Sequence, residues 1–587
     1  MQISALIPSA YSPAEPTCSR RLRVGAILDS LVMPAWVKHI LEQVDSSECL
    51  ELTLLACTDA SVPRSAWENL KNGPQSTFFR AWTWLDYRIF ATRTEQPNAV
   101  ETVRFAPARS TPRMLYRPHQ EKYFGACELD AIRNAHIDVL LDFTGTATRE
   151  VHDCVHYGLW SLGTVESIAP SLFRDMCAGR RELEVDLSFT RNERFESLRQ
   201  LLFPTDLVSL FRNYNKYCWG QAQAITRTLL SLQRYGWEYV SKQEKARETG
   251  TCVLPSNQTT VLFLLRAAAR ILGTVLMRAC FREDWFIAYR QHCPALVAET
   301  AATEFVVVKA PRDRFYADPF VIERDGKAFI FFEDYSFKNR KAVISMIEID
   351  ATGNPSVPEP VLEANYHVSY PCVFEWDGEM YMLPESKDNH TIELYRATDF
   401  PRGWRREHVL MTGVSTVDST VVRYDEKFWL FTSGLTQSER LFDGDNELSL
   451  FFSETPFGPW EAHPKNPIVS DIRRCRPAGR LFFEAGQLIR PSQDCSGRYG
   501  RRVCFNRVNL LSDTDYDETP MATVTTHWFP RNRGTHTFNQ SGRYQVVDGR
   551  TLVSRFIPRC RQMGVERAKS PSPLVIPVIC EGARSQW

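Results

Sequence analysis

Residues 317–334 read ADPFVIERDGKAFIFFED, and this stretch decides the fold of the C-terminal half. Two runs of alternating apolar residues flank Asp325-Gly326, a dipeptide that favours a tight turn. The stretch is therefore predicted to form a β-hairpin. Three later stretches align with it: SYPCVFEWDGEMYMLPES at 369–386, VDSTVVRYDEKFWLFTSG at 417–434 and CRPAGRLFFEAGQLIRPSQD at 475–494.

The hairpins belong to a longer repeat, because each is followed by a third strand-like run, at 342–350, 391–400, 447–460 and 501–510. The units begin roughly 50 to 60 residues apart, a period typical of the blades of a β-propeller. A fifth unit begins near His536, and WFIAYR at 285–290 is expected to complete it. We predict an all-β five-bladed β-propeller over residues 283–558, followed by a poorly ordered tail over 559–587.

The N-terminal part has the pattern of an α/β domain, over residues 20–190. RVGAILD at 23–29, LELTLLAC at 50–57 and IDVLLDF at 137–143 read as buried strands with helical patterns between them. No glycine-rich phosphate loop follows the first strand.

Apolar residues at three- and four-residue steps then predict a helical connector over residues 191–282. Its segment Val261–Phe281 carries Arg266, Arg270 and Arg278, which are costly inside a bilayer. We therefore expect this helix to pack on protein and not to span a membrane.

The α/β domain resembles the formyltransferases that use formyl-tetrahydrofolate, in RVGAILDS at 23–30 and HYGLWSLGTVESIAPSLF at 156–173. That family uses an Asn and a His to polarise the formyl group and transfer protons. The matching positions here are Ser161 and Gly163. The resemblance implies a degenerate formyltransferase-like, Rossmann-type domain.

The propeller pattern also predicts where a site lies, because equivalent positions of the innermost strands converge on the central channel. Carboxylates there can protonate a leaving oxygen, aromatic rings stack on sugars, and Arg and His bind anions. The alternative is that these polar groups only satisfy buried strand ends and turns. The residues that head the five first strands are Asp318, Tyr370, Asp418, Arg476 and His536, with Glu333 and Glu385 in the second strands of the first two units.

The propeller sequence resembles two families. ADPF at 317–320 and the later Asp418 are similar to glycoside hydrolases of the arabinanase and β-xylosidase type. That resemblance implies Asp318 as base or nucleophile, Asp418 as the group that tunes pKa, and Glu385 or Glu484 as general acid. RFYADPFVIERDGKAFIFFED, YPCVFEWDGEMYMLPES, VDSTVVRYDEKFWLF, RRCRPAGR and THTFN resemble more closely the propeller domain of plant glucosamine inositolphosphorylceramide transferases. Those enzymes carry their glycosyltransferase fold in a separate domain, so the propeller resemblance alone does not imply transferase activity.

The composition narrows the classes of partner. The 587 residues include 70 Lys+Arg and 70 Asp+Glu, a balance that argues against a protein built to coat nucleic acid or an anionic membrane. The cysteines are scattered without C-x-x-C pairs, so we expect neither a metal nor a cofactor. The N-terminal residues lack the pattern of a secretory signal, and we expect a cytoplasmic protein.

Together these patterns favour a glycan-active protein that hydrolyses or transfers a sugar, with Asp318, Asp418 and Glu385 as catalytic residues. Glu333, Tyr370, Arg476 and His536 are expected to bind substrate. A noncatalytic scaffold that binds a carbohydrate or lipid headgroup and a formyl-tetrahydrofolate-dependent transferase are the alternatives. The expected partner is a sugar or glycoconjugate, without nucleic acid or an integral membrane span. Peripheral contact with a membrane glycolipid pathway is compatible with this interpretation.

Overall fold

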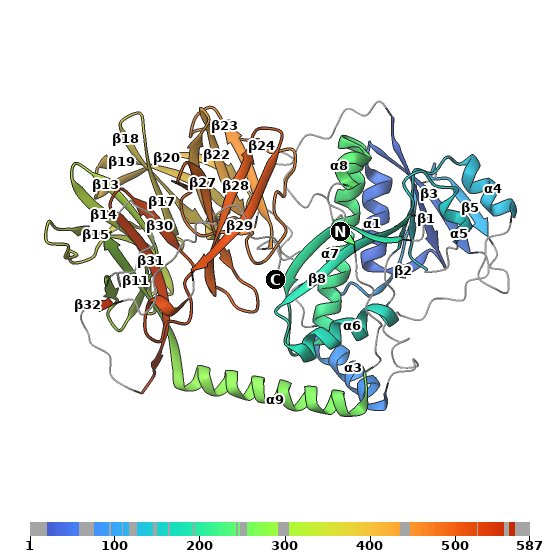
Figure 1. Ribbon diagram of the computed structural model, residues 1–587, viewed down its shortest axis with the longest axis horizontal. Coiled ribbons are helices and arrows are strands. Elements are labelled where there is room, and N and C mark those ends of the chain that lie inside the picture. Colours follow the sequence, from blue (N-terminus) through green and yellow to red (C-terminus); the bar gives the residue numbers. More distant parts are fainter. Residues whose placement is uncertain are drawn as a thin grey trace. The chain divides into compact units, whose positions relative to one another are not determined.

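The computed structural model describes the chain in segments and divides it into two compact units (Figure 1). One unit covers residues 14–270, with 439–442, and the other covers most of residues 271–587. The described residues are 20–57, 76–92, 96–108, 110–116, 126–144, 149–161, 165–191, 194–241, 245–246, 255–291, 304–434, 446–524, 526–556 and 563–569.

The N-terminal unit contains the predicted parallel α/β sheet, extended at one edge by antiparallel strands. The parallel strands lie in the order β5-β3-β1-β6-β7, in which the first strand of the chain is central and the connections run outward to both sides. Their bounds are β1 Leu22–Leu28, β3 Leu50–Cys57, β5 Arg113–Tyr116, β6 Val139–Asp142 and β7 Leu159–Ser161, and the antiparallel strands are β8 Glu182–Arg191, β9 Arg194–Pro204 and β10 Lys245–Ala246. β2 (Val32–Pro34) and β4 (Thr102–Arg104) form a separate pair.

Helices surround this sheet. The long α7 is buried along most of its length and packs against α1, α3, α6 and β8. The helices are α1 Ala35–Ser46, α3 Thr77–Phe90, α4 Ala126–Asn134, α5 Arg149–His152, α6 Val165–Ala178, α7 Leu210–Tyr235 and α8 Trp237–Ser241.

The prediction that the connector is helical from its start is wrong for β9, which is a strand paired with β8. Leu198, Leu201 and Leu202 have helix-like spacing because the pairing slips by one residue between Leu187 and Ser188. Such a bulge interrupts the alternation by which a strand is recognised.

The expected burial of the segment Val261–Phe281 is also wrong for most of its length. The helix α9 (Asn257–Cys280) is long and apolar enough to cross a bilayer, and it is the one such helix among the described residues. It buries Thr260, Phe263 and Ala267, whereas most of its other side chains are exposed.

The C-terminal unit (Figure 1) is the predicted five-bladed β-propeller, in which each blade is a separate sheet. Blade one comprises β13 Arg314–Arg324, β14 Lys327–Ser336, β15 Lys341–Ile349 and β16 Glu359–Leu362; blade two β17 Ser369–Trp376, β18 Glu379–Ser386, β19 Thr391–Asp399 and β20 Gly403–Thr412; blade three β21 Val417–Tyr424, β22 Lys427–Ser433, β23 Leu448–Ser453 and β24 Glu461–Ala462; blade four β25 Arg476–Pro477, β26 Phe482–Glu484, β27 Gln487–Asp494, β28 Arg502–Leu511 and β29 Tyr516–Val524.

Blade five joins the two ends of the propeller sequence. It consists of β30 (Phe538–Ser541) and β31 (Tyr544–Ser554), completed by β11 (Phe281–Gln291) and β12 (Glu304–Lys309) from before blade one. β11 pairs with β31 from Phe281 opposite Ser554 to Gln291 opposite Tyr544, which confirms that residues 285–290 close the ring.

The tail is not wholly irregular as predicted, because β32 (Gly564–Lys569) pairs with the outer strand β12. Apolar faces of adjacent blades pack together, as where Phe320 of blade one meets Tyr370 of blade two at 4.9 Å between ring centroids. This packing holds the innermost strands in a fixed relation to one another.

Candidate active site at the centre of the propeller

A backbone irregularity recurs at the head of the first strand in three blades. The pairing of β13, β17 and β21 with the second strand of each blade is interrupted next to Asp318, Tyr370 and Asp418. These residues have φ angles of 52°, 45° and 52°, in the left-handed region that non-glycine residues rarely adopt. Such conformations cost about 1–3 kcal/mol and are found disproportionately at functional sites.

Asp318 belongs to a hydrogen-bonded group with two residues of blade five. Its carboxylate lies 3.3 Å from Nε2 of His536 and accepts a hydrogen bond of 2.8 Å from Thr537 Oγ1. The other imidazole nitrogen, Nδ1, contacts Asp548, whose carboxylate also accepts from the His536 backbone N–H at 2.8 Å. Asp318, His536 and Asp548 are all buried. We call these three residues the Asp–His–Asp group.

Asp418 belongs to a second group, with residues from blades two and four. Its carboxylate pairs with the guanidinium of Arg476 and accepts a hydrogen bond of 2.7 Å from Gln493 Nε2. Its backbone N–H donates to Glu385 Oε2 at 3.0 Å, and Glu385 is only partly buried. The structure therefore brings Asp418, Glu385 and Arg476 together.

The protonation of these groups is set by burial and by crowding of carboxylates. Burial, opposed by His536, raises the pKa of Asp318 to about 6. Burial and the nearby Asp418 raise the pKa of Glu385 to about 8. Burial raises the pKa of Glu333 well above its usual range, with Asp318 adding to the effect. At neutral pH the Glu385 carboxyl is therefore mostly protonated and the Asp318 carboxyl mostly ionised.

The two neighbouring carboxylates favour the charged form of His536. Burial disfavours its imidazolium form, yet Asp548 and Asp318 together hold the pKa of His536 above its usual value. Both ring nitrogens face a carboxylate, so the protonated ring can donate to each of them.

The same three side chains are also potential metal ligands. Their ligand atoms all lie within 4.8 Å of one another, and they form the one group of at least three potential metal ligands found among the described residues. A metal would need a neutral imidazole nitrogen, whereas the two flanking carboxylates stabilise the imidazolium. The donor set therefore fits a hydrogen-bonded Asp–His–Asp group better than a metal ion.

Three of the other candidate residues make contacts with other partners. Tyr370 is fully buried, and its hydroxyl accepts the Gly479 backbone N–H at 2.5 Å and lies 2.9 Å from Thr420 Oγ1. Glu333 is buried, with an oxygen 3.5 Å from His367 Nε2. Glu484 pairs with Gln487 at the turn end of the blade-four hairpin, whereas Arg476 pairs with Gln493 at its other end. That separation is about 20 Å along the strand.

Sequence reasoning missed four contributors to this centre. They are Asp548, Gln493, Trp285 and Tyr499. The rings of Trp285 and Tyr499 lie 4.2 Å and 5.4 Å from the His536 ring, and Arg476 stacks on Tyr499 at 4.9 Å. Trp285 and Asp548 reach the centre only through closure of blade five. In the sequence, the acidic Asp548 within VVDGR at 546–550 was a sign that could have identified it as a candidate.

The fold and its charged centre define the C-terminal unit as a five-bladed β-propeller of the kind in which polar residues converge at the axis. Residues 294–557 match the family model described as "Glucosamine inositolphosphorylceramide transferase 1, N-terminal". The chain is 35% identical over 243 residues to Glucosamine inositolphosphorylceramide transferase 1 of Oryza sativa subsp. japonica, covering 41% of this chain and 32% of that protein. The match to the Arabidopsis thaliana protein of the same name is 35% over 207 residues, or 35% and 27% of the two chains. The chain thus spans about a third of the length of these relatives.

Solved structures with a similar fold include the GH43_1 enzyme from Xanthomonas citri complexed with xylose, with 14% sequence identity and a TM-score of 0.31. The match covers 42% of this chain and 89% of that enzyme. Another is Zg3597, a family 117 glycoside hydrolase of Zobellia galactanivorans, at 14% identity and a TM-score of 0.29 over 47% and 93%.

Proposed function

We propose that the propeller acts on a glycan, hydrolysing or transferring a sugar, with Glu385 as general acid and Asp318 as base or nucleophile. One observation carries the proposal: two nearby carboxyl groups have pKa values of about 8 and about 6. Surroundings that push two carboxyl pKa values apart assign one group as proton donor and the other as acceptor at neutral pH. Relatives of the propeller that are named glucosamine inositolphosphorylceramide transferase 1 support the same substrate class.

In this proposal Glu385 gives its proton to the glycosidic oxygen as the bond to the sugar breaks. Asp318 either takes a proton from an attacking water or acceptor hydroxyl, or attacks the sugar carbon itself and forms an ester that is then hydrolysed. Asp418 raises the pKa of Glu385 and so keeps that residue protonated. Arg476, stacked on the partly exposed Tyr499, offers a cation and an aromatic face to the substrate.

A second function is favoured by another observation. Both aspartates are paired with basic side chains, Asp318 with His536 and Asp418 with Arg476. Such pairing is also what a purely binding or structural centre would use. A noncatalytic sugar- or headgroup-binding scaffold is therefore the second candidate.

Formyl transfer by the α/β unit remains a third proposal. Gly163, which matches a catalytic position of the formyltransferases, lies outside the described residues. Ligand binding is therefore the way to decide between this unit and the propeller.

The test is a thermal-shift screen of the full chain, because a ligand that binds only the folded state raises the melting temperature. Nucleotide sugars, amino sugars, pentosides, inositol phosphates and folates are compared on wild type and on Asp318→Asn/Asp418→Asn. The matched control is Asp325→Asn/Asp425→Asn, which makes the same chemical change at the turn ends of the same two hairpins.

We expect a sugar or sugar phosphate to stabilise wild type and the control by about 2–3 kcal/mol at a hundredfold excess over Kd, and not the site variant. Turnover of the ligand that binds then separates an enzyme from a scaffold. A folate shift that survives the site substitutions, without any sugar shift, contradicts the proposal and moves the chemistry to the α/β unit.

A further inference from the structure

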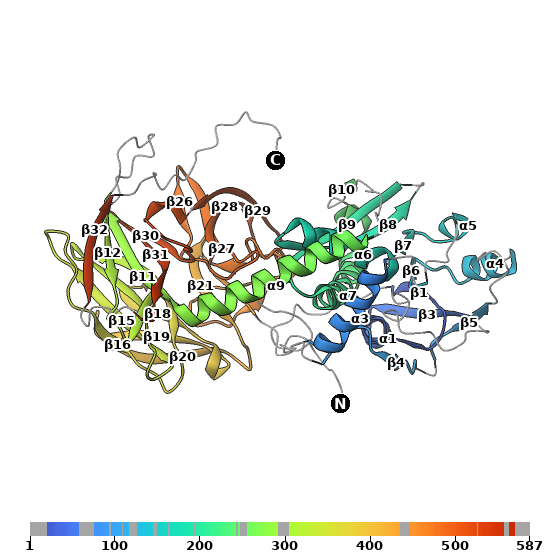
Figure 2. The same cartoon turned by 90° about the horizontal axis from the view of Figure 1, so that it is seen from below.

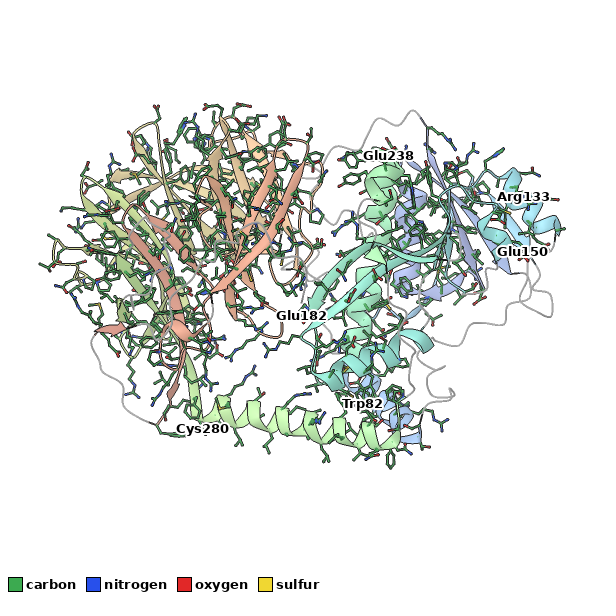
Figure 3. All side chains as sticks on the ribbon, in the orientation of Figure 1. Trp82, Arg133, Glu150, Glu182, Glu238 and Cys280 are labelled. Carbon is green, nitrogen blue, oxygen red and sulfur yellow. The ribbon has the colours of Figure 1, made fainter. Side chains whose placement is uncertain are left out.

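The helix α9 exposes an unusually continuous apolar surface. At 3.6 residues per turn, its exposed apolar side chains other than Met277 occupy about half of the helix circumference, with no charged residue among them. We call this surface the α9 apolar face; it consists of Val261, Leu262, Leu264, Leu265, Ala268, Ala269, Ile271, Leu272, Val275, Leu276 and Ala279. Leu265 and Leu272 are 64% and 60% exposed. Figure 3 shows side chains projecting along the lower edge of α9.

A second helix extends this apolar surface. α3 lies beside the first turns of α9, as Figures 1 and 2 both show, and Trp82 (labelled in Figure 3) contacts Phe263 at 5.0 Å between ring centroids. The outward side of α3 exposes Phe78, Trp84, Leu85 and Ile89. Large exposed apolar surfaces of this kind mark interaction sites.

The charges on the two helices have one sign. α9 contains no Asp or Glu, and Arg266 and Arg278 are exposed on the half of the helix that borders the α9 apolar face. In α3 the one acidic residue, Asp86, is buried, while Arg88 stacks over Trp84 at 5.3 Å. The overall charge of the chain is balanced, so these helices form a local cationic and apolar surface on a neutral protein.

We propose that α9 and the outward side of α3 bind the surface of a membrane that contains anionic lipids, with α9 lying in the plane of the interface. Apolar side chains would enter the boundary between headgroups and acyl chains, Trp84 would lie at headgroup level, and the arginines would meet lipid phosphates. This inference is independent of the chemistry proposed for the propeller.

Two other occupants fit less well. α9 is about 36 Å long, enough to cross a bilayer, but Phe263 is held against Trp82, and Arg270 donates to the Leu207 carbonyl at 3.2 Å. A spanning helix would have to give up these contacts. A second copy of the chain would pair the same surface with itself, which brings like-charged arginines together.

The test is flotation of the full chain with lipid vesicles, either phosphatidylcholine alone or phosphatidylcholine with about one third phosphatidylserine. Leu265→Glu/Leu272→Glu places charge in the α9 apolar face. The matched control is Val357→Glu/Phe556→Glu, two propeller residues that are 78% and 76% exposed. Circular dichroism and the melting temperature verify that each variant folds.

We expect wild type and the control to float with the phosphatidylserine vesicles. The α9 variant should bind these vesicles at least about tenfold more weakly than wild type. Arg266→Ser/Arg278→Ser should reduce the preference for anionic lipid, and about 0.5 M salt should do the same for wild type. Asp318→Asn/Asp418→Asn should float like wild type, so a failed sugar site does not affect this test.

Three outcomes overturn the inference. Wild type that floats with neither vesicle shows that the surface has another role. A wild-type dimer that the α9 variant converts to a monomer, measured by light scattering without lipid, shows that a second copy covers the face. Protein that stays in the membrane after washing with alkaline carbonate shows a span.

Discussion

The two aspartates at the centre of the propeller occupy equivalent positions, share the same strained backbone and differ in their partners. Asp318 faces His536, whose charge depends on pH, whereas Asp418 faces Arg476, whose guanidinium stays protonated at any accessible pH. The repeat therefore supplies one position twice, once in a group that can exchange protons and once in a fixed ion pair.

The largest difference should appear in stability when each aspartate is truncated. Asp418→Ala removes the carboxylate that pairs with the largely buried Arg476, and we expect a loss of about 3–5 kcal/mol in the free energy of unfolding. Asp318→Ala should cost about 1–2 kcal/mol, because His536 keeps Asp548 and can lose its proton. Calorimetry of the propeller transition measures both. Adding Arg476→Met to Asp418→Ala should recover most of the loss, and equal costs for the two truncations would show that the two pairs do not differ.

Glu385→Gln should stabilise the protein at pH 8 by roughly 1–3 kcal/mol and leave it nearly unchanged at pH 4. The folded-state pKa of about 8 lies above the usual value of 4.5, so the folded protein binds more protons in this range. Stability from this group is thus present below about pH 4.5 and lost as the pH rises through about 8. Unfolding in urea at a series of pH values tests this. A pH dependence as steep in the variant as in wild type would place the titration on other groups.

Tyr370→Phe should cost about 1–2 kcal/mol in stability and leave ligand binding unchanged. Its hydroxyl accepts the Gly479 backbone N–H and contacts Thr420, so the change removes a contact between blades. Urea unfolding gives the first quantity, and ligand-induced melting shifts, taken relative to the variant's own baseline, give the second. A lost ligand shift with normal stability would return Tyr370 to the role of substrate ligand.

Glu484→Gln should have the smallest effect, less than about twofold on turnover, because Glu484 lies at the turn end of its hairpin. Steady-state kinetics on the substrate found by the ligand screen measures it beside Glu385→Gln, for which we expect a loss of about a hundredfold or more. Similar losses in the two variants would overturn the assignment of Glu385.

The repeat made much of the site predictable. Hairpins with matched Asp318, Tyr370 and Asp418 indicated both the propeller and its centre, because register within a repeat fixes which residues converge. Asp548 and Trp285 were missed because their approach depends on pairing between β11 and β31, which no local pattern encodes. The strand β9 resembled a helix because a bulge changed the spacing of its leucines, and the composition of α9 did not reveal how little of it is covered.

The closure of blade five also orders events during synthesis. β11 leaves the ribosome early, yet its partner β31 ends at Ser554, after all the other blades have been made. Until then β11 presents an open edge, to which a chaperone or another strand could bind. Because His536 and Asp548 arrive with that last blade, a chain that stops short of it has Asp318 without its partners. The charged centre of the propeller can therefore assemble only after the last blade has been synthesised.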